Sequence, residues 1–293
     1  MKVKSVVLYF IYHYLFWLPD RWYLSLLYRV RMNKRLNLRT PRTFNEKLNW
    51  LKLYDRKPQY TQLVDKYTVK QFITNTIGSQ YVIPTIGLWN SPDEIDFASL
   101  PSSFVLKTTH GGGNTGVVIC KDKSTADFVE IKSKLKQSYK DSIYRRLREW
   151  PYKNVKPRII AEPFMVDSMN DELIDYKFFA FDGCVQALFV ATGRNSGEVK
   201  FDFFDKDFQP LDIVQSHPQS GINIKRPSTF DEMIYIAEKL SVGIPHVRVD
   251  LYEINGRVYF GELTFYHHGA VTPFHPEEWD YKFGSWLTLP KII

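Results

Sequence analysis

The residues with the clearest chemistry lie in one stretch, Phe104 to Cys120, which reads FVLKTTHGGGNTGVVIC. A short apolar run ends at Lys107, residues 110–116 are rich in glycine, and a second apolar run follows. This order predicts a strand, a glycine loop and a second strand. A lysine beside unhindered backbone N–H groups can bind a polyphosphate, because the amides form an anion-binding concavity and the ammonium adds a full charge.

This stretch differs from the common phosphate-binding motifs. Lys107 comes before the glycines and a strand follows them, so the stretch is neither a GxxxxGK[ST] loop nor a GxGxxG turn that opens a helix. A solvated hairpin with a glycine-rich tip explains the same residues without any ligand. The nucleotide interpretation therefore depends on what else the chain carries.

A second set of residues lies on a predicted hairpin around Asn255-Gly256. In the segment VRVDLYEIN, apolar residues alternate with Arg248 and Asp250, so one face is core and the other is polar. Glu262 and Thr264 share a face of the return strand. Two carboxylates on one hairpin can bind magnesium between themselves and the phosphates of a nucleotide.

The register of this hairpin decides whether the two carboxylates meet. A strict two-residue turn would place Asp250 opposite Gly261 and turn Glu262 to the other face. The metal interpretation therefore requires a β-bulge or a loop of odd length. Without either, the charges form the solvated face of a half-exposed hairpin.

Three further polar positions have simple alternative explanations as surface charge. Asp175 and Lys177 share a strand face by their spacing of two. Glu162 ends a predicted strand and precedes the apolar residues 163–166, whose backbone is suited to an adenine ring. We treat all three as candidates because of the residues that accompany them.

The first half of the chain favours helices. Thr43 and Glu46 form a capping box that predicts a helix to Tyr54, and a second helix is expected over 65–76. Residues 81–88 are expected to form a strand that is either at a sheet edge or irregular, because they contain a proline. Residues 124–150 are expected to form one long helix with a basic C-terminal half.

The second half favours antiparallel strands. Strands are expected over 158–162, and over 173–181 and 184–192 around an Asp-Gly turn. A second capping box, Thr229 to Glu232, predicts a helix to Leu240, before the hairpin of 247–254 and 257–265. This order of elements predicts an α+β fold.

Composition is that of a folded globular protein. The 293 residues are 44% hydrophobic and 24% charged, which excludes disorder and allows one large domain or two to three subdomains. Cys120 and Cys184 both lie in apolar runs, which predicts reduced core thiols in a cytoplasmic protein.

The positive charge is concentrated at the N-terminus. Residues 1–60 carry 13 Lys/Arg and 3 Asp/Glu, and the remainder carries 26 and 29. Residues 1–28 hold nine aromatics, and the apolar run 6–18 is shorter than the roughly 20 residues that span a bilayer. This segment fits a helix lying on an anionic membrane face, or a helix packed on the body with a basic outer side. No nucleic-acid-binding motif accompanies it, so we expect no nucleic-acid partner.

Taken in order, the motifs resemble the ATP-grasp superfamily, and within it the TupA-like branch of polysaccharide and teichuronopeptide biosynthesis. The resemblance covers roughly residues 40–290 and rests on seven segments: Phe44–Leu48, Asp65–Tyr67, Phe104–Lys107 with its glycine loop, Ile159–Glu162, Asp175–Phe179, Arg248–Tyr252 and Phe260–Phe265. It implies an ATP-grasp fold of the α+β class, in which two α+β units hold Mg-ATP under a flexible glycine loop. The expected segments are 1–40 (basic, aromatic and helical), 41–100 (helical), 101–165 (glycine loop) and 166–293 (antiparallel β).

The resemblance also implies a role for each matching residue. Residues implied to bind ATP are Lys66, Lys107, His110, Gly111, Gly112, Gly113, Thr115, Gly116, Glu162, Pro163, Phe164, Met165 and Asp175. Those implied to act on the γ-phosphate or the acceptor are Arg248, Lys177 and Arg194, and those implied to hold Mg²⁺ are Asp250, Glu262 and Thr264. Many ATP-grasp enzymes have asparagine where this chain has Thr264, and the residues that follow, including His267 and His268, depart from the usual pattern.

The implied activity is an ATP-dependent carboxylate–amine ligase of cell-surface polysaccharide biosynthesis. Its partners would be a glycan or sugar-acid acceptor, which a lipid could carry, an amino acid or other amine, and an anionic membrane at the inner face of the cytoplasmic membrane. A glycan kinase on the same fold, a polysaccharide glycosyltransferase and a non-catalytic scaffold remain alternatives.

Overall fold

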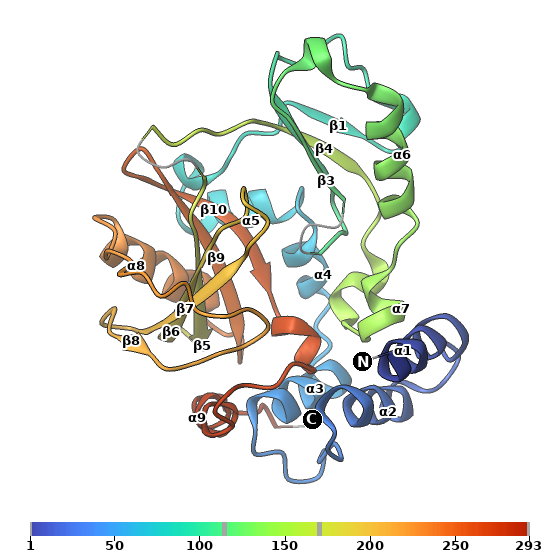
Figure 1. Ribbon diagram of the computed structural model, residues 1–293, viewed down its shortest axis with the longest axis vertical. Coiled ribbons are helices and arrows are strands. Elements are labelled where there is room, and N and C mark those ends of the chain that lie inside the picture. Colours follow the sequence, from blue (N-terminus) through green and yellow to red (C-terminus); the bar gives the residue numbers. More distant parts are fainter. Residues whose placement is uncertain (1, 113–115, 169–171, 292–293) are drawn as a thin grey trace. The chain divides into compact units, whose positions relative to one another are not determined.

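The computed structural model describes residues 2–112, 116–168 and 172–291. The chain divides into two compact units (Figure 1). The larger unit comprises residues 1–56, 145–150 and 167–293, and the smaller unit comprises residues 57–144 and 151–166. The boundaries of these units do not coincide with those of the four segments expected from the sequence, which stay a prediction.

The smaller unit is built on a four-stranded antiparallel sheet in the order β1-β4-β2-β3. Its strands are β1 (Gly87–Trp89), β2 (Phe104–Thr108), β3 (Val117–Cys120) and β4 (Ile159–Pro163). Helix α6 (Phe128–Tyr139) packs on β2 and β3 (Figure 1). Phe104 and Leu106 are fully buried in the core of this unit, so the alternate residue Lys107 lies on the other face.

Three expected elements of the smaller unit are shorter or broken. Helix α5 (Val69–Thr76) begins later than residue 65, because the Asp65 side chain accepts hydrogen bonds from the N–H groups of Tyr67 and Thr68. Of residues 81–88, only 87 and 88 are in a strand. The expected long helix is interrupted after residue 139, where the Asp141 side chain accepts from the Ser142 N–H.

Further helices and 3-10 turns connect these elements. They are α4 (Gln59–Val64), α7 (Ile143–Leu147), η1 (Ser79–Tyr81), η2 (Pro92–Glu94), η3 (Lys123–Thr125) and η4 (Trp150–Asn154).

The larger unit is built on a six-stranded antiparallel sheet in the order β10-β9-β5-β6-β7-β8. Its strands are β5 (Asp175–Phe181), β6 (Cys184–Thr192), β7 (Lys200–Asp205), β8 (Pro210–Leu211), β9 (Val247–Ile254) and β10 (Arg257–Thr264). Both expected hairpins are confirmed. The expectation of two core thiols is half wrong: Cys120 is buried, but Cys184 is exposed at the start of β6.

The two faces of this sheet are covered differently. Helix α8 (Phe230–Ser241) packs on β5, β6 and β9, where the Phe178 and Phe230 rings are in contact. On the opposite face, Phe179 contacts Phe44 of α3 (Phe44–Tyr54) and Phe283 of α9 (Glu278–Trp286). Further along β5 the same face becomes polar, at Lys177 and Asp175.

The two expected capping boxes have different outcomes. At α3, Thr43 and Glu46 make both hydrogen bonds of the box. At α8, the Thr229 hydroxyl donates instead to Glu253, so the helix forms without a side-chain cap. The second box was a wrong prediction because a neighbouring strand supplies a competing acceptor.

The larger unit begins with a helical hairpin. Its helices α1 (Lys2–Tyr14) and α2 (Asp20–Met32) pack around Ile11, Tyr23 and Leu27. A 3-10 turn, η5 (His267–Ala270), follows β10. None of the helices within the described residues is long and apolar enough to cross a membrane.

Candidate active site

One row of polar side chains crosses three strands of the larger unit. Lys177 on β5 is paired with Asp250 on β9, and Asp250 is paired with Glu262 on β10. Arg248 is paired with Thr264 one step along the same two strands. Residues paired directly across strands share a face, so these side chains stand on one side of the sheet.

A β-bulge at Gly261 produces this register. The pairing shifts between Phe260 and Glu262, which leaves Gly261 as the extra residue and sets Glu262 opposite Asp250. A Cβ at Gly261 would lie 3.0 Å from the carbonyl oxygen of Asp250, so the bulge suits a residue without a side chain. The condition set by the sequence for the carboxylates to meet is therefore fulfilled.

Asp250 is the most heavily engaged carboxylate of this row. It is 1% exposed, and Arg248 donates to both of its oxygens, from Nε and from Nη2, at 2.7 Å each. Lys177 donates to the same carboxylate and lies 3.0 Å from Asp175. Burial alone would raise the pKa of Asp250, but Arg248 and Lys177 outweigh burial and hold that pKa below its usual value.

Asp175 extends the cluster toward the turn after β6. It is 1% exposed and forms an ion pair with Arg194. Glu172 fixes this turn by accepting from the Arg194 N–H at 2.8 Å. Within the chain as described, Asp175 Oδ1 accepts no hydrogen bond, so one buried carboxylate oxygen is left for a ligand.

Arg248 is held from a second side by a histidine. Its Nη1 lies 2.9 Å from His267 Nδ1, and His267 Nε2 lies 2.7 Å from Gln215 Oε1. Burial, with neighbouring His268 and Arg248, lowers the pKa of His267 well below its usual value. We did not expect this contact, because no spacing in the sequence connects either Gln215 or His267 with Arg248.

The oxygens of this cluster suit a hard cation. Asp250, Glu262 and Thr264 offer two carboxylates and a hydroxyl, the kind of ligand that Mg²⁺ prefers. The Thr264 hydroxyl lies 3.4 Å from Glu262 Oε1 and accepts from Arg248 at 3.0 Å. Among residues 2–112, 116–168 and 172–291, no group of three His, Cys, Asp or Glu side chains is placed to hold a metal. The fit therefore rests on the donor types and on the Gly261 bulge.

The smaller unit carries a separate basic cluster. Lys107 on β2 and Lys70 on α5 each lie 2.5 Å from one oxygen of Glu162, which is on β4. Burial alone would raise the pKa of Glu162, but the two lysines outweigh burial and lower it. Lys70 was missed because nothing in its spacing distinguishes it from a surface lysine.

Lys66 serves the glycine loop rather than this cluster. Its Nζ donates to the Gly111 carbonyl at 2.5 Å, and its backbone N–H donates to Thr109. At the far end of the loop, Gly116 has φ +79°, and a Cβ there would lie within 2.3 Å of the Thr108 and Ser138 hydroxyls. Gly113 and Thr115 lie outside the described residues.

Other expected residues of the smaller unit are placed as follows. His110 is buried, with its ring edge-on to Tyr139. Gly112 approaches Ile143 closely, since a Cβ would lie 2.8 Å from its side chain. Pro163 ends β4, and Phe164 and Met165 follow it partly exposed.

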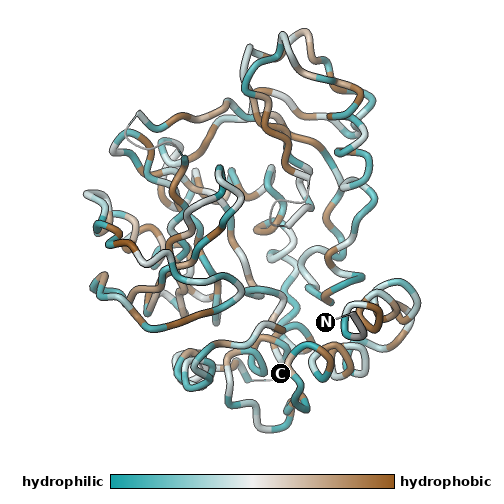
Figure 2. Tube along the Cα trace, in the orientation of Figure 1, coloured by the Kyte–Doolittle hydropathy of each residue, from teal (hydrophilic) through white to brown (hydrophobic). Residues whose placement is uncertain are grey.

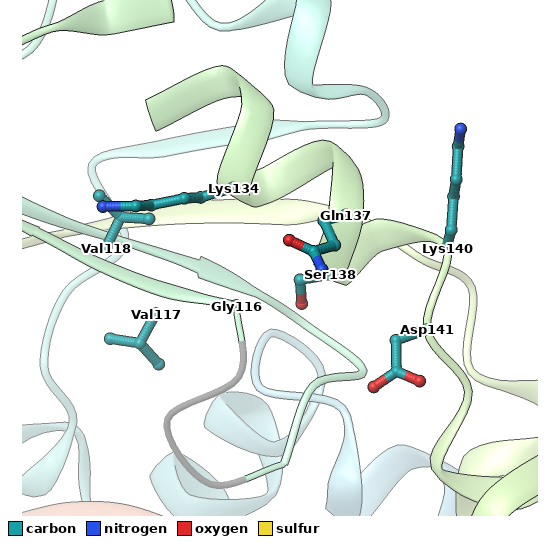
Figure 3. Close-up of a pocket in the computed structure, with 8 residues that line it drawn as sticks. All are labelled: Gly116, Val117, Val118, Lys134, Gln137, Ser138, Lys140 and Asp141. Carbon is teal, nitrogen blue, oxygen red and sulfur yellow. The ribbon is translucent and has the colours of Figure 1, made fainter. Parts of the chain in front are cut away.

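A hollow of about 480 Å³ lies between β3 and α6 (Figure 3). Eight residues line it: Gly116, Val117, Val118, Lys134, Gln137, Ser138, Lys140 and Asp141. In Figure 3 the Lys134 side chain lies along Val118, whereas Lys140 points away from Asp141. Of the residues expected to bind ATP, Gly116 alone among those described lines this hollow, so we do not identify it with the nucleotide site.

The structure thus gathers the expected residues into two sets. Asp175, Lys177, Arg194, Arg248, Asp250, Glu262 and Thr264 form one set in the larger unit. Lys107 and Glu162 form the other, with Lys66 on the glycine loop. These two sets contain the residues that the sequence resemblance matched to the ATP-grasp enzymes, a class of ATP-dependent ligases.

Within the class of ATP-grasp enzymes, one family matches the sequence. The chain belongs to the TupA-like ATPgrasp family, whose pattern it matches over residues 46–288. This confirms the resemblance, the α+β ATP-grasp fold and the enzyme class. A comparison with curated protein sequences finds no match.

Solved structures similar to this chain include two D-alanine–D-alanine ligases. The one from Bacillus anthracis has 16% identity and a TM-score of 0.41, over 75% of this chain and 59% of that one. The one from Helicobacter pylori has 15% identity and a TM-score of 0.44, over 84% and 69%. The ATP-grasp ligase PsnB, complexed with a precursor variant, Mg and ADP, has 14% identity and a TM-score of 0.40, over 75% and 57%. The chain therefore spans about six tenths of the first and third of these proteins.

Proposed function

We propose that the protein is an ATP-dependent carboxylate–amine ligase that works through an acyl phosphate. The observation that carries this proposal is the Gly261 bulge, which sets Glu262 opposite Asp250 beside Arg248 and Lys177. Two acids for a divalent cation and two cations for a transferring phosphoryl group are what such chemistry requires.

Each cluster has its own part in this proposal. Lys107 would contact the α and β phosphates, and Lys66 would act beside it by holding the glycine loop at Gly111. Because Glu162 already accepts from Lys107 and Lys70, we assign it to positioning these lysines. The adenine is then left to the backbone of residues 163–165.

The cluster of the larger unit would hold magnesium and the γ-phosphate. Asp250, Glu262 and Thr264 supply the oxygens for Mg²⁺, which when bound neutralises phosphate charge. Lys177 and Arg248 now neutralise Asp250, and an arriving phosphate would compete for both cations. Such an exchange would free the Asp250 oxygens for the metal.

The reaction has two steps. A carboxylate oxygen of the acceptor attacks the γ-phosphorus of ATP, the bond to the β-phosphate oxygen breaks, and ADP leaves. The amine lone pair then attacks the acyl carbon, inorganic phosphate leaves, and the nitrogen loses a proton. Arg248 and Lys177 stabilise charge on the transferring phosphoryl group, and Arg194, on the turn after β6, would hold the acceptor carboxylate beside Asp175.

We assign the acceptor to a uronic acid of a cell-surface glycan and the amine to an amino acid. The support is membership of the TupA-like family, together with the sequence resemblance to the branch of polysaccharide and teichuronopeptide biosynthesis. A lipid-linked glycan acceptor would bring the enzyme to the inner face of the cytoplasmic membrane. Family membership favours the ligase over the glycosyltransferase.

The test follows the γ-phosphate. Purified protein is incubated with γ-labelled ATP, magnesium, uronic-acid oligosaccharides and an amino-acid pool. Free phosphate that appears only with both carboxylate and amine supports the ligase, and Glu262→Gln should abolish it. Glu198→Gln, at a side chain 80% exposed, is the matched control.

Two other outcomes contradict the proposal. Label retained on the glycan would identify a kinase. Label that stays on ATP, despite tight Mg-ATP binding and a broad acceptor panel, would count against transfer to a carboxylate.

A further inference from the structure

The α1–α2 hairpin exposes large aromatic side chains on its outer side. We define the N-terminal face by six of them: Tyr9, Phe10, Tyr14, Phe16, Trp17 and Trp22. Trp17 and Trp22 are 68% and 70% exposed, and the other four are each more than half exposed. Single exposed aromatics are ordinary, but a run of six on one hairpin indicates an interaction surface.

These residues belong to a folded helical hairpin and not to an unstructured terminus. Ile11, Tyr23 and Leu27 of the same helices are almost completely buried against one another. The turn between the helices is held by Arg148, whose Nη2 donates to the Phe16 carbonyl at 2.6 Å. The aromatic side chains are therefore held on the outside by packing within the larger unit.

The outer side of α1 differs from the basic outer side that the sequence led us to expect for a helix packed on the body. The helix does pack on the body, but its outer side is aromatic and not chiefly basic. The rings pair along it, with Tyr9 stacked on His13 at 4.0 Å and Phe10 stacked on Tyr14 at 5.2 Å. Hydrophobic residues along both helices are drawn brown in Figure 2. Tyr and Trp, with an apolar body and a polar tip, are the side chains enriched at membrane–water interfaces.

The charges around this face have one sign. Lys4, Arg21 and Arg29 are exposed on the same two helices. The one acidic residue among positions 1–40, Asp20, contacts both Arg56 and Arg148. The face therefore offers uncompensated positive charge to an anionic surface.

We infer that the N-terminal face binds an anionic lipid bilayer, with α1 and α2 lying on the membrane surface. Aromatic rings enter the headgroup region while Lys4, Arg21 and Arg29 contact lipid phosphates. A protein partner would need a fixed surface complementary to six aromatic side chains and several cations. A fluid anionic bilayer can rearrange its lipids around both the aromatic rings and the cations. This inference deepens the proposed location and does not depend on the reaction, since its test measures binding alone.

The experiment is co-sedimentation of the full chain with vesicles. Vesicles of pure phosphatidylcholine are compared with vesicles containing phosphatidylglycerol, without ATP. We expect binding to the anionic vesicles only, weakened about tenfold or more by Arg21→Ala with Arg29→Ala, because each cation near the surface contributes to the attraction. Trp17→Ser with Trp22→Ser should weaken binding by a similar factor. Tyr235→Ser, at an exposed ring on α8, is the matched control.

Three outcomes would overturn the inference. One is a lack of binding to either vesicle, and another is binding that survives both double variants. The third is self-association in solution that the tryptophan variant abolishes, without vesicle binding, which would assign the face to a second copy of the chain. Circular dichroism of each variant checks that the exposed substitutions leave the fold intact.

Discussion

The two polar clusters of this protein differ in how their charges balance. In the larger unit three carboxylates face three cations, which are Lys177, Arg194 and Arg248. In the smaller unit two lysines share the single carboxylate of Glu162. The first cluster is neutral and the second has a surplus positive charge.

Under the proposed function, this difference in charge predicts that the two clusters respond differently to phosphate and to magnesium. A surplus cation attracts a polyphosphate directly, since little has to be displaced before it binds. A neutral, buried cluster binds a cation and a phosphoryl group only as a pair, because either one alone would leave a desolvated charge without a partner. We therefore expect substitutions in the larger unit to abolish metal-dependent steps and those in the smaller unit to weaken affinity.

The largest effect is expected for Asp250→Asn. It leaves Lys177 and Arg248 without their shared carboxylate, so we expect turnover to fall by a factor of about 10² to 10³. The free energy of unfolding should fall by about 3 kcal/mol, because a buried pair is broken. Turnover and nucleotide binding are measured with and without Mg²⁺, at a temperature where the variant is folded. Asp207→Asn, at an exposed surface pair, is the control, and Mg²⁺-dependent binding unchanged from wild type would contradict the assignment.

The next effect is expected for Lys107→Ala. Loss of one charged hydrogen-bond donor should raise the Kd for Mg-ATP by a factor of about 10 to 100, which corresponds to roughly 1.5–3 kcal/mol. The dependence of turnover on Mg²⁺ concentration should stay as in wild type. Isothermal titration calorimetry measures the Kd, and phosphate release at several Mg²⁺ concentrations measures the dependence of turnover, with the exposed Lys121→Ala as control. If turnover of the variant no longer depended on Mg²⁺ while the Kd for Mg-ATP stayed unchanged, the roles assigned to the two clusters would have to be exchanged.

Glu162→Gln should alter how stability depends on pH. The folded pKa of Glu162 lies below its usual value of 4.5, so its carboxylate stabilises the fold above pH 4.5. That stabilisation is lost as the pH falls through the folded pKa. We therefore expect wild type to lose more stability than the variant between pH 5 and acid pH, and to be more stable by about 1–2 kcal/mol at pH 7. Denaturant unfolding at several pH values measures the free energy of unfolding of both proteins. If that free energy changed with pH in the same way in both, the ion pairs of Glu162 with the two lysines would contribute nothing to stability.

The smallest effect is expected for Gly261→Ala. The added Cβ would lie 3.0 Å from the Asp250 carbonyl oxygen and from the Tyr252 ring, so both must shift by a few tenths of an ångström. We expect a loss of about 1 kcal/mol in stability and a higher Mg²⁺ requirement, with ATP affinity at saturating Mg²⁺ little changed. A titration of Mg²⁺ at fixed ATP measures the requirement. An unaltered requirement would mean that the bulge does not tune the metal site.

Local signals predicted much of the larger unit's sheet. The Asp-Gly and Asn-Gly turns predicted both hairpins, and alternation along 247–254 predicted the face that carries Arg248 and Asp250. The capping box at Thr43 predicted the start of α3. These succeeded because the interactions that decide them lie within a few residues of one another.

The failures involve partners far apart in the chain. Lys70 reaches Glu162 across 92 residues, and Gln215 reaches His267 across 52. The box at Thr229 failed for the same reason, since the Thr229 hydroxyl donates its hydrogen bond to Glu253 on β9. From the sequence it was clear that Glu262 requires a β-bulge to lie opposite Asp250, but not that Gly261 forms this bulge.

The contact between Arg248 and His267 fixes the direction of every proton in a short chain of hydrogen bonds. A guanidinium has no acceptor, so His267 Nδ1 must carry a lone pair and the ring proton must sit on Nε2, pointing at Gln215 Oε1. Gln215 then turns its NH₂ to the Thr272 carbonyl, 3.1 Å away. A second proton on the imidazole would point a donor at the arginine, so mild acid leaves the orientation of Arg248 untouched. Nitrogen-15 shifts of the His267 ring should accordingly report one neutral tautomer throughout the range in which ordinary histidines titrate.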